Sequence, residues 1–155
     1  MKKNILLFFC FAFSVVSFAQ KMLLPKALPM SSSSMVSMND DENYAFVSVN
    51  RKQLLKADYK TGKEFVVLDV EQLKDSPIEN IGGFSFSSDE TKILVYPFSE
   101  KMGKDTCSRE FYIYDVLRSK IEKLSDYGAQ QQPTFSPNGK MVAFVRNNDL
   151  FIKRL

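Results

Sequence analysis

The feature that most constrains the fold of this chain is a repeated turn-and-strand motif. Residues 86–90 (FSSDE) precede the apolar run 92–96, and residues 135–139 (FSPNG) precede the run 141–145, so the two copies start 49 residues apart. A weaker copy, MNDDE, starts at Met38, which is 48 residues before Phe86. A period of about 40–50 residues made of short strands is typical of the blades of a β-propeller.

The strand pattern predicts an all-β fold. Short runs rich in β-branched and aromatic residues alternate with turn residues. We expect a partial β-propeller of about three four-stranded antiparallel blades, the last one incomplete. Because a closed ring usually needs about 4–8 blades, we expect the chain to be a piece of a longer protein. The expected strands are 44–49, 53–59, 64–68, 84–87, 92–98, 110–116, 121–124, 133–136, 141–146 and 149–155, and residues 71–76 are the one place for a short helical turn.

The composition excludes several classes of function for these 155 residues. The chain has no histidine, so it cannot assemble a Ser-His-Asp or Cys-His triad or a histidine-ligated zinc site. The net charge of +3 is too balanced to indicate a nucleic-acid partner. We therefore expect no catalytic residue, metal site or cofactor in this chain.

Three short motifs resemble functional sites, but a structural role is the stronger interpretation of each. Ser85 lies in GFSFS, which is close to a nucleophile elbow, yet it falls in a predicted strand rather than a strand-to-helix turn. Residues 40–42 (DDE) resemble calcium ligands but align with the turns of the other copies. Cys107 has polar neighbours and no histidine to activate its thiol.

The N-terminus predicts export. Lys2 and Lys3 precede an apolar run over residues 5–16, and Ser17-Phe18-Ala19 provides the small residues of a cleavage site. Residues 1–19 are therefore predicted to be a signal peptide, with an uncleaved anchor as the alternative. Residues 20–35, which are rich in Met, Pro and Ser, are predicted to be a linker before blades that occupy residues 36–155. The expected location is the periplasm or the extracellular space.

A longer set of segments resembles a known family. These segments are 86–89 (FSSD), 110–116 (EFYIYDV), 124–126 (LSD), 131–140 (QQPTFSPNGK) and 143–150 (AFVRNNDL). Together they resemble the first propeller blades of bacterial dipeptidyl peptidase IV, in the prolyl oligopeptidase group of serine peptidases. The resemblance covers roughly residues 44–155 and is most specific from Tyr112 through Leu150.

The resemblance implies a function for a longer protein. Members of this family carry a propeller over a C-terminal α/β-hydrolase domain, whose Ser, Asp and His release dipeptides after a penultimate Pro or Ala. None of these three catalytic positions falls in the matching stretch, so we expect this chain to be inactive alone. The implied partners are a peptide substrate, the hydrolase domain and, for the full-length protein, a second copy in a homodimer.

One substrate contact is expected within this chain. The family usually places an Arg that contacts the substrate in the loop before the YIYD strand, and eleven residues before Asp115 this sequence has Lys104. Lys104 keeps the positive charge but lacks the planar fork of Arg. Arg109 is the second candidate, if the loop is threaded differently.

A function of another class stays open at this point. The chain can also be interpreted as part of a non-catalytic periplasmic propeller that binds a protein partner through its loops. The long segment 99–109 before the YIYD strand favours the peptidase. A nucleophile elbow followed by Asp and His later in the reading frame would decide between the two.

Overall fold

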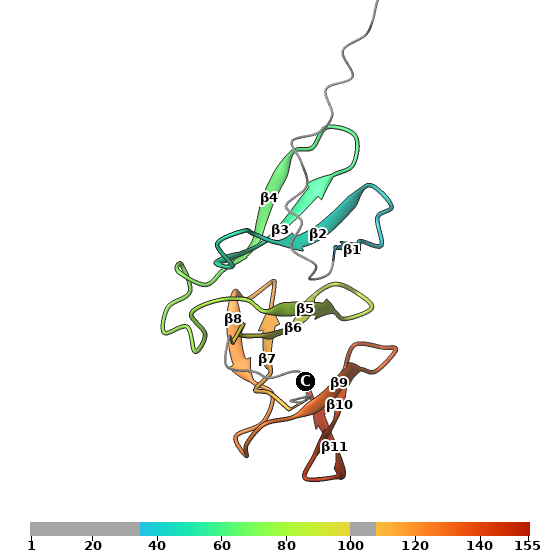
Figure 1. Cartoon of the computed structure of the whole chain (residues 1–155). Coiled ribbons are helices and arrows are strands. Elements are labelled where there is room, and N and C mark those ends of the chain that lie inside the picture. Colours follow the sequence, from blue (N-terminus) through green and yellow to red (C-terminus); the bar gives the residue numbers. More distant parts are fainter. Residues whose placement is uncertain (1–34, 100–107) are drawn as a thin grey trace, which may run out of the picture.

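The structure, a computed structural model, describes residues 35–99 and 108–155, which form three antiparallel sheets (Figure 1). The first sheet has the order β1-β2-β3-β4, the second β5-β6-β7-β8, and the third β9-β10-β11. Each sheet is a meander of consecutive strands, as expected of a propeller blade. The structure therefore confirms the predicted partial propeller with an incomplete third blade.

The strands lie close to the predicted runs. Blade 1 contains β1 (Val36–Ser37), β2 (Asn43–Val47), β3 (Gln53–Asp58) and β4 (Glu64–Asp69). Blade 2 contains β5 (Gly83–Phe86), β6 (Lys92–Tyr96), β7 (Tyr112–Asp115) and β8 (Lys120–Lys123). Blade 3 contains β9 (Gln131–Phe135), β10 (Met141–Arg146) and β11 (Asp149–Arg154). The short strand β1 was not among the expected strands, because two residues carry no alternating pattern.

Buried apolar side chains hold neighbouring blades together. Alternate residues of a strand point to opposite faces of its sheet, so a blade with neighbours on both sides has two apolar faces. One cluster lies between blades 1 and 2 and includes Ala45, Leu54, Leu68, Ile81, Ile93 and Val95. A second lies between blades 2 and 3 and includes Leu94, Ile113, Leu124, Val142 and Phe144. Neighbouring blades therefore pack with the face of one sheet against the face of the next.

The turns after the first strand of each blade are equivalent. Asp41, Glu90 and Gly139 all have positive φ, at 55°, 56° and 67°, and they follow one another at intervals of 49 residues. In Figure 1 the turns β1–β2, β5–β6 and β9–β10 lie on the same side of the three blades. The first copy of the motif therefore starts at Ser37, one residue earlier than the expected Met38, and the period is 49 throughout.

The segment that joins blades 1 and 2 differs from the prediction. Residues 71–76 form turns and bends and contain no helix, so the expected helical turn is wrong. The Asp69 carboxylate accepts the Glu71 N–H at 2.9 Å and fixes a turn there. Pro77 also disfavours helical backbone at Ser76.

The described residues include no helix long and apolar enough to cross a membrane. The predicted signal peptide, residues 1–19, and nearly all of the predicted linker, residues 20–35, lie outside the described residues.

Candidate functional site

Of the two predicted substrate contacts, the structure describes one. Lys104 lies outside the described residues, as does Cys107. Arg109 is described, and it lies just before β7 at the end of the connection from β6. The candidate site is therefore built from Arg109 and the residues that hold it.

The backbone of Arg109 is fixed by Gln130, which begins the approach to blade 3. The Arg109 N–H donates to the Gln130 carbonyl at 2.9 Å, and the Gln130 N–H donates back to the Arg109 carbonyl at 2.8 Å. The Gln130 side chain is buried, with 1% of the residue exposed, and its Oε1 accepts the Phe111 N–H at 3.0 Å. Its Nε2 donates to the Gly128 carbonyl. A buried amide that uses both its donor and its acceptor is a rigid support for the neighbouring chain.

The side chain of Arg109 stacks on an aromatic ring. Its guanidinium carbon lies 4.3 Å from the centroid of the Tyr96 ring, and Phe111 contacts that ring edge to face at 5.3 Å. A Cβ at Gly83 would collide with the Tyr96 hydroxyl, so glycine makes room for the ring. A cation–π contact at a half-exposed site contributes about 0.5–1 kcal/mol. Arg109 is therefore held by its backbone and by its side chain.

The guanidinium of Arg109 has N–H groups that can bind a ligand. Among the described residues, no carboxylate lies within 4 Å of it, whereas Arg118, Lys52, Lys123 and Lys153 each pair with one. A stacked guanidinium still presents N–H groups in its plane, and these fit a carbonyl or a carboxylate.

The nearby titratable groups do not suit acid–base catalysis. Burial, assisted by the Tyr112 hydroxyl donating to Glu110 at 2.7 Å, raises the pKa of Tyr112 to about 12. The phenol is therefore protonated at neutral pH. Glu110 also pairs with Lys123 at 3.5 Å. These contacts tie the start of β7 to β8 and occupy the Glu110 carboxylate.

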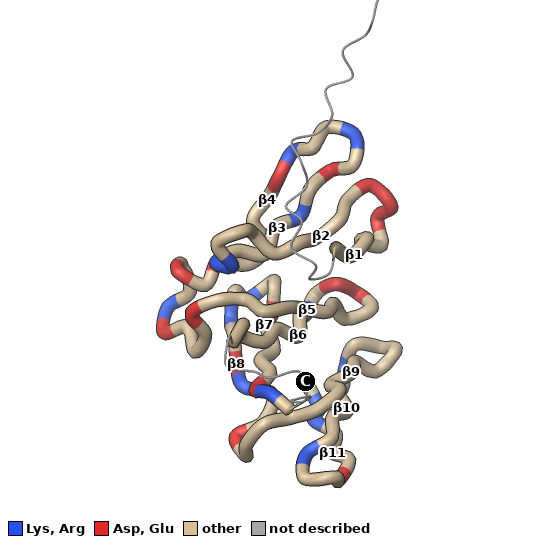
Figure 2. Tube along the Cα trace, in the orientation of Figure 1, with Lys and Arg blue, Asp and Glu red and all other residues tan. Residues whose placement is uncertain are grey.

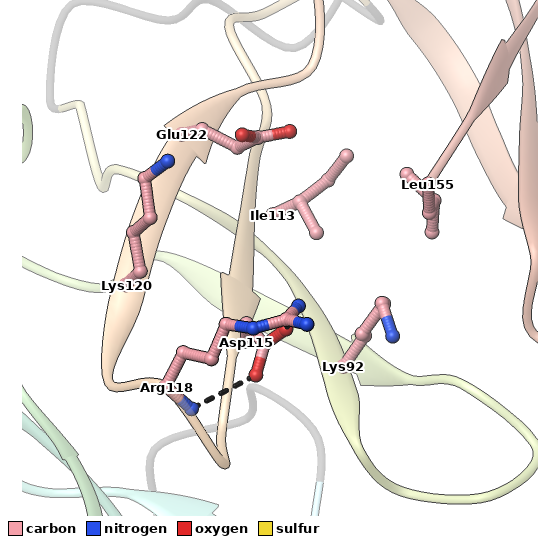
Figure 3. Close-up of a pocket in the computed structure, with 7 residues that line it drawn as sticks. All are labelled: Lys92, Ile113, Asp115, Arg118, Lys120, Glu122 and Leu155. Carbon is pink, nitrogen blue, oxygen red and sulfur yellow. Dashed lines mark hydrogen bonds and ion pairs between the residues drawn. The ribbon is translucent and has the colours of Figure 1, made fainter.

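A cavity of about 290 Å³ lies at the opposite end of blade 2 (Figure 3). It is lined by Lys92, Ile113, Asp115, Arg118, Lys120, Glu122 and Leu155. Arg118 donates its backbone N–H to Asp115 at 3.0 Å, which lowers the pKa of that carboxyl, and it also pairs with it through its side chain. Glu122 pairs with Lys153, which does not line the cavity. The lining offers no nucleophile, so this cavity is the weaker candidate.

Two motifs that resemble functional sites have structural roles. Ser85 lies in the middle of β5 and pairs with Leu94, which confirms the strand assignment. Asp40 Oδ1 accepts the N–H groups of Glu42 and Asn43 at 3.0 and 2.9 Å, so this carboxylate caps its own turn.

Sequence reasoning missed the residues that hold Arg109. Tyr96 was placed in a strand and Gln130 was not singled out. The importance of Gln130 comes from the burial of its side-chain amide. A single sequence does not show that a glutamine is buried, so it gave no signal.

Comparisons with known proteins give matches to dipeptidyl peptidases. The sequence profile described as "Dipeptidyl peptidase IV (DPP IV) N-terminal region" matches residues 87–155. "Probable dipeptidyl-aminopeptidase B" of Tuber melanosporum (strain Mel28) is 34% identical over 82 residues, which are 51% of this chain and 9% of the relative. "Dipeptidyl-aminopeptidase B" of Aspergillus niger is 25% identical over 126 residues, 78% of this chain and 14% of the relative.

A solved structure shares both the fold and the sequence. The crystal structure of Porphyromonas gingivalis dipeptidyl peptidase 4 matches with a TM-score of 0.71 and 33% identity. The match covers 79% of this chain and 18% of that chain. The chain thus spans less than a fifth of the length of each of these three relatives.

Proposed function

We propose that the complete protein is a serine peptidase that releases dipeptides from peptide N-termini. The basis is that residues 87–155 match the N-terminal region of dipeptidyl peptidase IV. The observation that carries this proposal is the agreement of sequence and fold over the same blades. It favours the peptidase over a non-catalytic propeller that binds a protein partner.

In this proposal the blades and the catalytic domain have different roles. With no histidine among its 155 residues, the chain cannot supply the general base of a serine peptidase. The nucleophile, base and aspartate are assigned to a C-terminal α/β-hydrolase domain outside this sequence. The blades contribute substrate positioning and control of access, and cleavage follows a penultimate Pro or Ala.

Residues 1–19 direct the protein out of the cytoplasm in this proposal. The two lysines, the apolar run and the small residues before Gln20 support a cleaved signal peptide. A homodimer of the full-length protein is part of the same proposal.

The test of the function compares the complete protein with residues 20–155 alone, using Gly-Pro p-nitroanilide. The complete protein is expected to release p-nitroaniline, and residues 20–155 are expected to release none above background. Activity of the isolated chain that survives purification and disappears in Ser85→Ala would overturn the assignment. An inactive, correctly folded complete protein would do so as well.

Lys104 is the proposed substrate contact, and Arg109 is the second candidate for the same role. A charge-assisted hydrogen bond contributes about 1.5–3 kcal/mol, so Lys104→Ala in the complete protein should lower kcat/KM about ten- to a hundredfold. Lys104→Arg should match or exceed the wild type. If Arg109→Ala produces this loss and Lys104→Ala changes kcat/KM less than about twofold, Arg109 takes the role instead.

A further inference from the structure

Each blade places one arginine on an aromatic ring at the same end of its sheet. Arg51 lies in the β2–β3 turn, and its guanidinium carbon is 4.0 Å from the centroid of the Phe98 ring. Arg109 stacks on Tyr96 at 4.3 Å. Arg146, the last residue of β10, lies 4.0 Å from the centroid of the Phe151 ring. We call these three residues the arginine row.

The arginines at the other end of the blades differ. Arg118 follows β7 and is paired with Asp115 at 2.9 Å, and Arg154 ends β11 opposite Met141, the first residue of β10. Neither stacks on a ring of the described residues. Among the described residues, stacked arginines thus occur at one end of the blades only, although Lys56 and Lys63 lie over the Phe65 ring of blade 1.

The support of Arg51 is rigid. Its carbonyl accepts the Ile81 N–H at 2.7 Å, which ties the turn of blade 1 to the segment entering blade 2. The Phe98 N–H donates to Asn80 Oδ1 at 2.6 Å. A Cβ at Gly82 would lie 2.8 Å from backbone atoms of Pro97 and Phe98, so that backbone passes directly over the glycine. Figure 2 shows the basic turn between β2 and β3 beside the segment that leads into β5.

Arg146 is held in a similar way. Its Nη1 donates to the Ser125 hydroxyl at 3.0 Å, and the Tyr127 ring lies on it at 5.3 Å. Tyr127 is 75% exposed, and Phe98 is 40% exposed. The row therefore combines fixed cations with apolar ring surface that is open to solvent.

The three arginines form no ion pair among the described residues. No carboxylate there lies within 4 Å of Arg51, Arg109 or Arg146, although four other cations have such partners. Asp149 is the register partner of Arg146 in the β10–β11 pair, but it is not within this distance. Stacking fixes the plane of a guanidinium and leaves its N–H fork at the edge, which matches a carboxylate. A fixed fork loses less conformational entropy on binding than a free arginine.

We propose that the arginine row is a binding surface for an acidic peptide segment. Carboxylate side chains pair with the guanidinium groups, and neighbouring apolar side chains of the peptide cover the exposed rings of Phe98 and Tyr127. The ring surface favours a peptide over a small inorganic anion, since only a peptide uses both features. This surface goes beyond the proposed release of dipeptides. It shares Arg109 with the candidate substrate site, whereas Arg51 and Arg146 lie outside that site.

The test measures binding of two peptides to the complete protein by isothermal titration calorimetry. Both peptides are acetylated and amidated, so that neither has a free amino or carboxyl end. One alternates Asp with Phe, and the other replaces each Asp by Asn. We expect the Asp peptide to bind more tightly, with an affinity that falls as NaCl rises from about 0.05 to 0.5 M.

Arg51→Gln and Arg146→Gln are the variants, because neither residue is a proposed substrate contact. Each should weaken binding of the Asp peptide about three- to tenfold, and the double variant should weaken it further. Arg51→Lys keeps the charge but not the stacked fork, and it should bind less tightly than the wild type. Arg118→Gln and Arg154→Gln, at the other end of the blades, should leave the affinity unchanged.

Several results would overturn the proposal. They are equal affinity for the Asp and Asn peptides, unchanged binding in the Arg51→Gln and Arg146→Gln double variant, and tighter binding of inorganic phosphate than of the Asp peptide. Melting curves exclude variants that fail to fold. Gly-Pro p-nitroanilide carries no carboxylate, so Arg51→Gln should leave its hydrolysis unaffected, and loss of dipeptide release and loss of peptide binding are separable results.

Discussion

Asp89 shows at the level of one residue why the turn motif recurs. Its Oδ1 accepts the Ser87 hydroxyl at 2.7 Å and the backbone N–H and hydroxyl of Thr91 at 3.2 and 2.9 Å. In blade 3, Asn138 Oδ1 accepts the Ser136 hydroxyl at 2.7 Å in the same way. An Asx side chain thus organises the backbone of a turn whose next residue has positive φ.

The carboxylate of Asp89 makes this turn sensitive to pH. The hydrogen bonds from Ser87 and Thr91 lower the pKa of Asp89 from 3.8 to about 2. Because the folded pKa is below the unfolded one, the stabilisation is fully present above the unfolded pKa and is lost as pH falls through about 2.

We expect Asp89→Asn to remove this dependence while keeping the turn, since blade 3 already uses asparagine there. Between pH 5 and pH 2, about the window set by the two pKa values, the urea midpoint of the wild type should fall more than that of the variant. Urea titrations of the complete protein at several pH values give both curves. Parallel curves would show that the Asp89 carboxylate contributes nothing to stability.

At the scale of elements, equivalent turns of successive blades are linked to one another. Asn39 donates its side-chain N–H to the Ser88 carbonyl at 2.8 Å, and Ser88 donates its hydroxyl to the Pro137 carbonyl at 2.7 Å. The three residues are spaced 49 apart along the sequence. Pro137 has no N–H and no polar side chain, so it cannot continue the series as a donor.

Removing one link should weaken the packing of two blades. Ser88→Ala eliminates the hydrogen bond to Pro137 and should lower the free energy of unfolding by about 0.5–1 kcal/mol, because the turn is exposed. The urea midpoint of the complete protein measures this change. Ser85→Ala, on the exposed face of β5, is the matched control. An equal effect of the two substitutions would mean that the link between blades carries no energy.

Within the whole molecule, blade 3 has an apolar face that no described blade covers. On blade 1 the corresponding cluster of Phe46, Leu55 and Ala57 with Tyr44 is buried, with 7%, 9% and 1% of the first three residues exposed. On blade 3, Leu150 and Ile152 are 70% and 63% exposed on β11, the last strand of its sheet. Exposed apolar faces beside an unpaired strand edge promote association.

We expect residues 20–155 alone to associate through the exposed face of blade 3. The double variant Leu150→Lys/Ile152→Lys should raise the monomer fraction, because two charges oppose burial of that face. Size-exclusion chromatography with light scattering measures the monomer fraction at several concentrations. Wild-type chain that is monomeric and melts in one sharp transition would instead show that three blades are self-sufficient.

Much of the fold follows from local pattern. The strands of blades 2 and 3 were predicted within a few residues, because β-branched runs and turns such as 138–139 (NG) are local signals. Strand β1 was not predicted, because it is defined by its pairing with β2. The one-residue shift of the first turn was not predicted either, because it is visible only when the positive-φ positions of the three turns are compared.

The sequence by itself determined the repeat, the all-β blades and the absence of a histidine-based catalytic site within the chain, since period and composition do not depend on contacts. Only the tertiary structure decided which side chains meet. Arg51 and Phe98 lie 47 residues apart in the sequence yet stack at 4.0 Å, and Arg109 meets Tyr96 and Gln130 from three separate segments. Such contacts are created when blades pack face to face, and a single sequence records the residues but not their proximity.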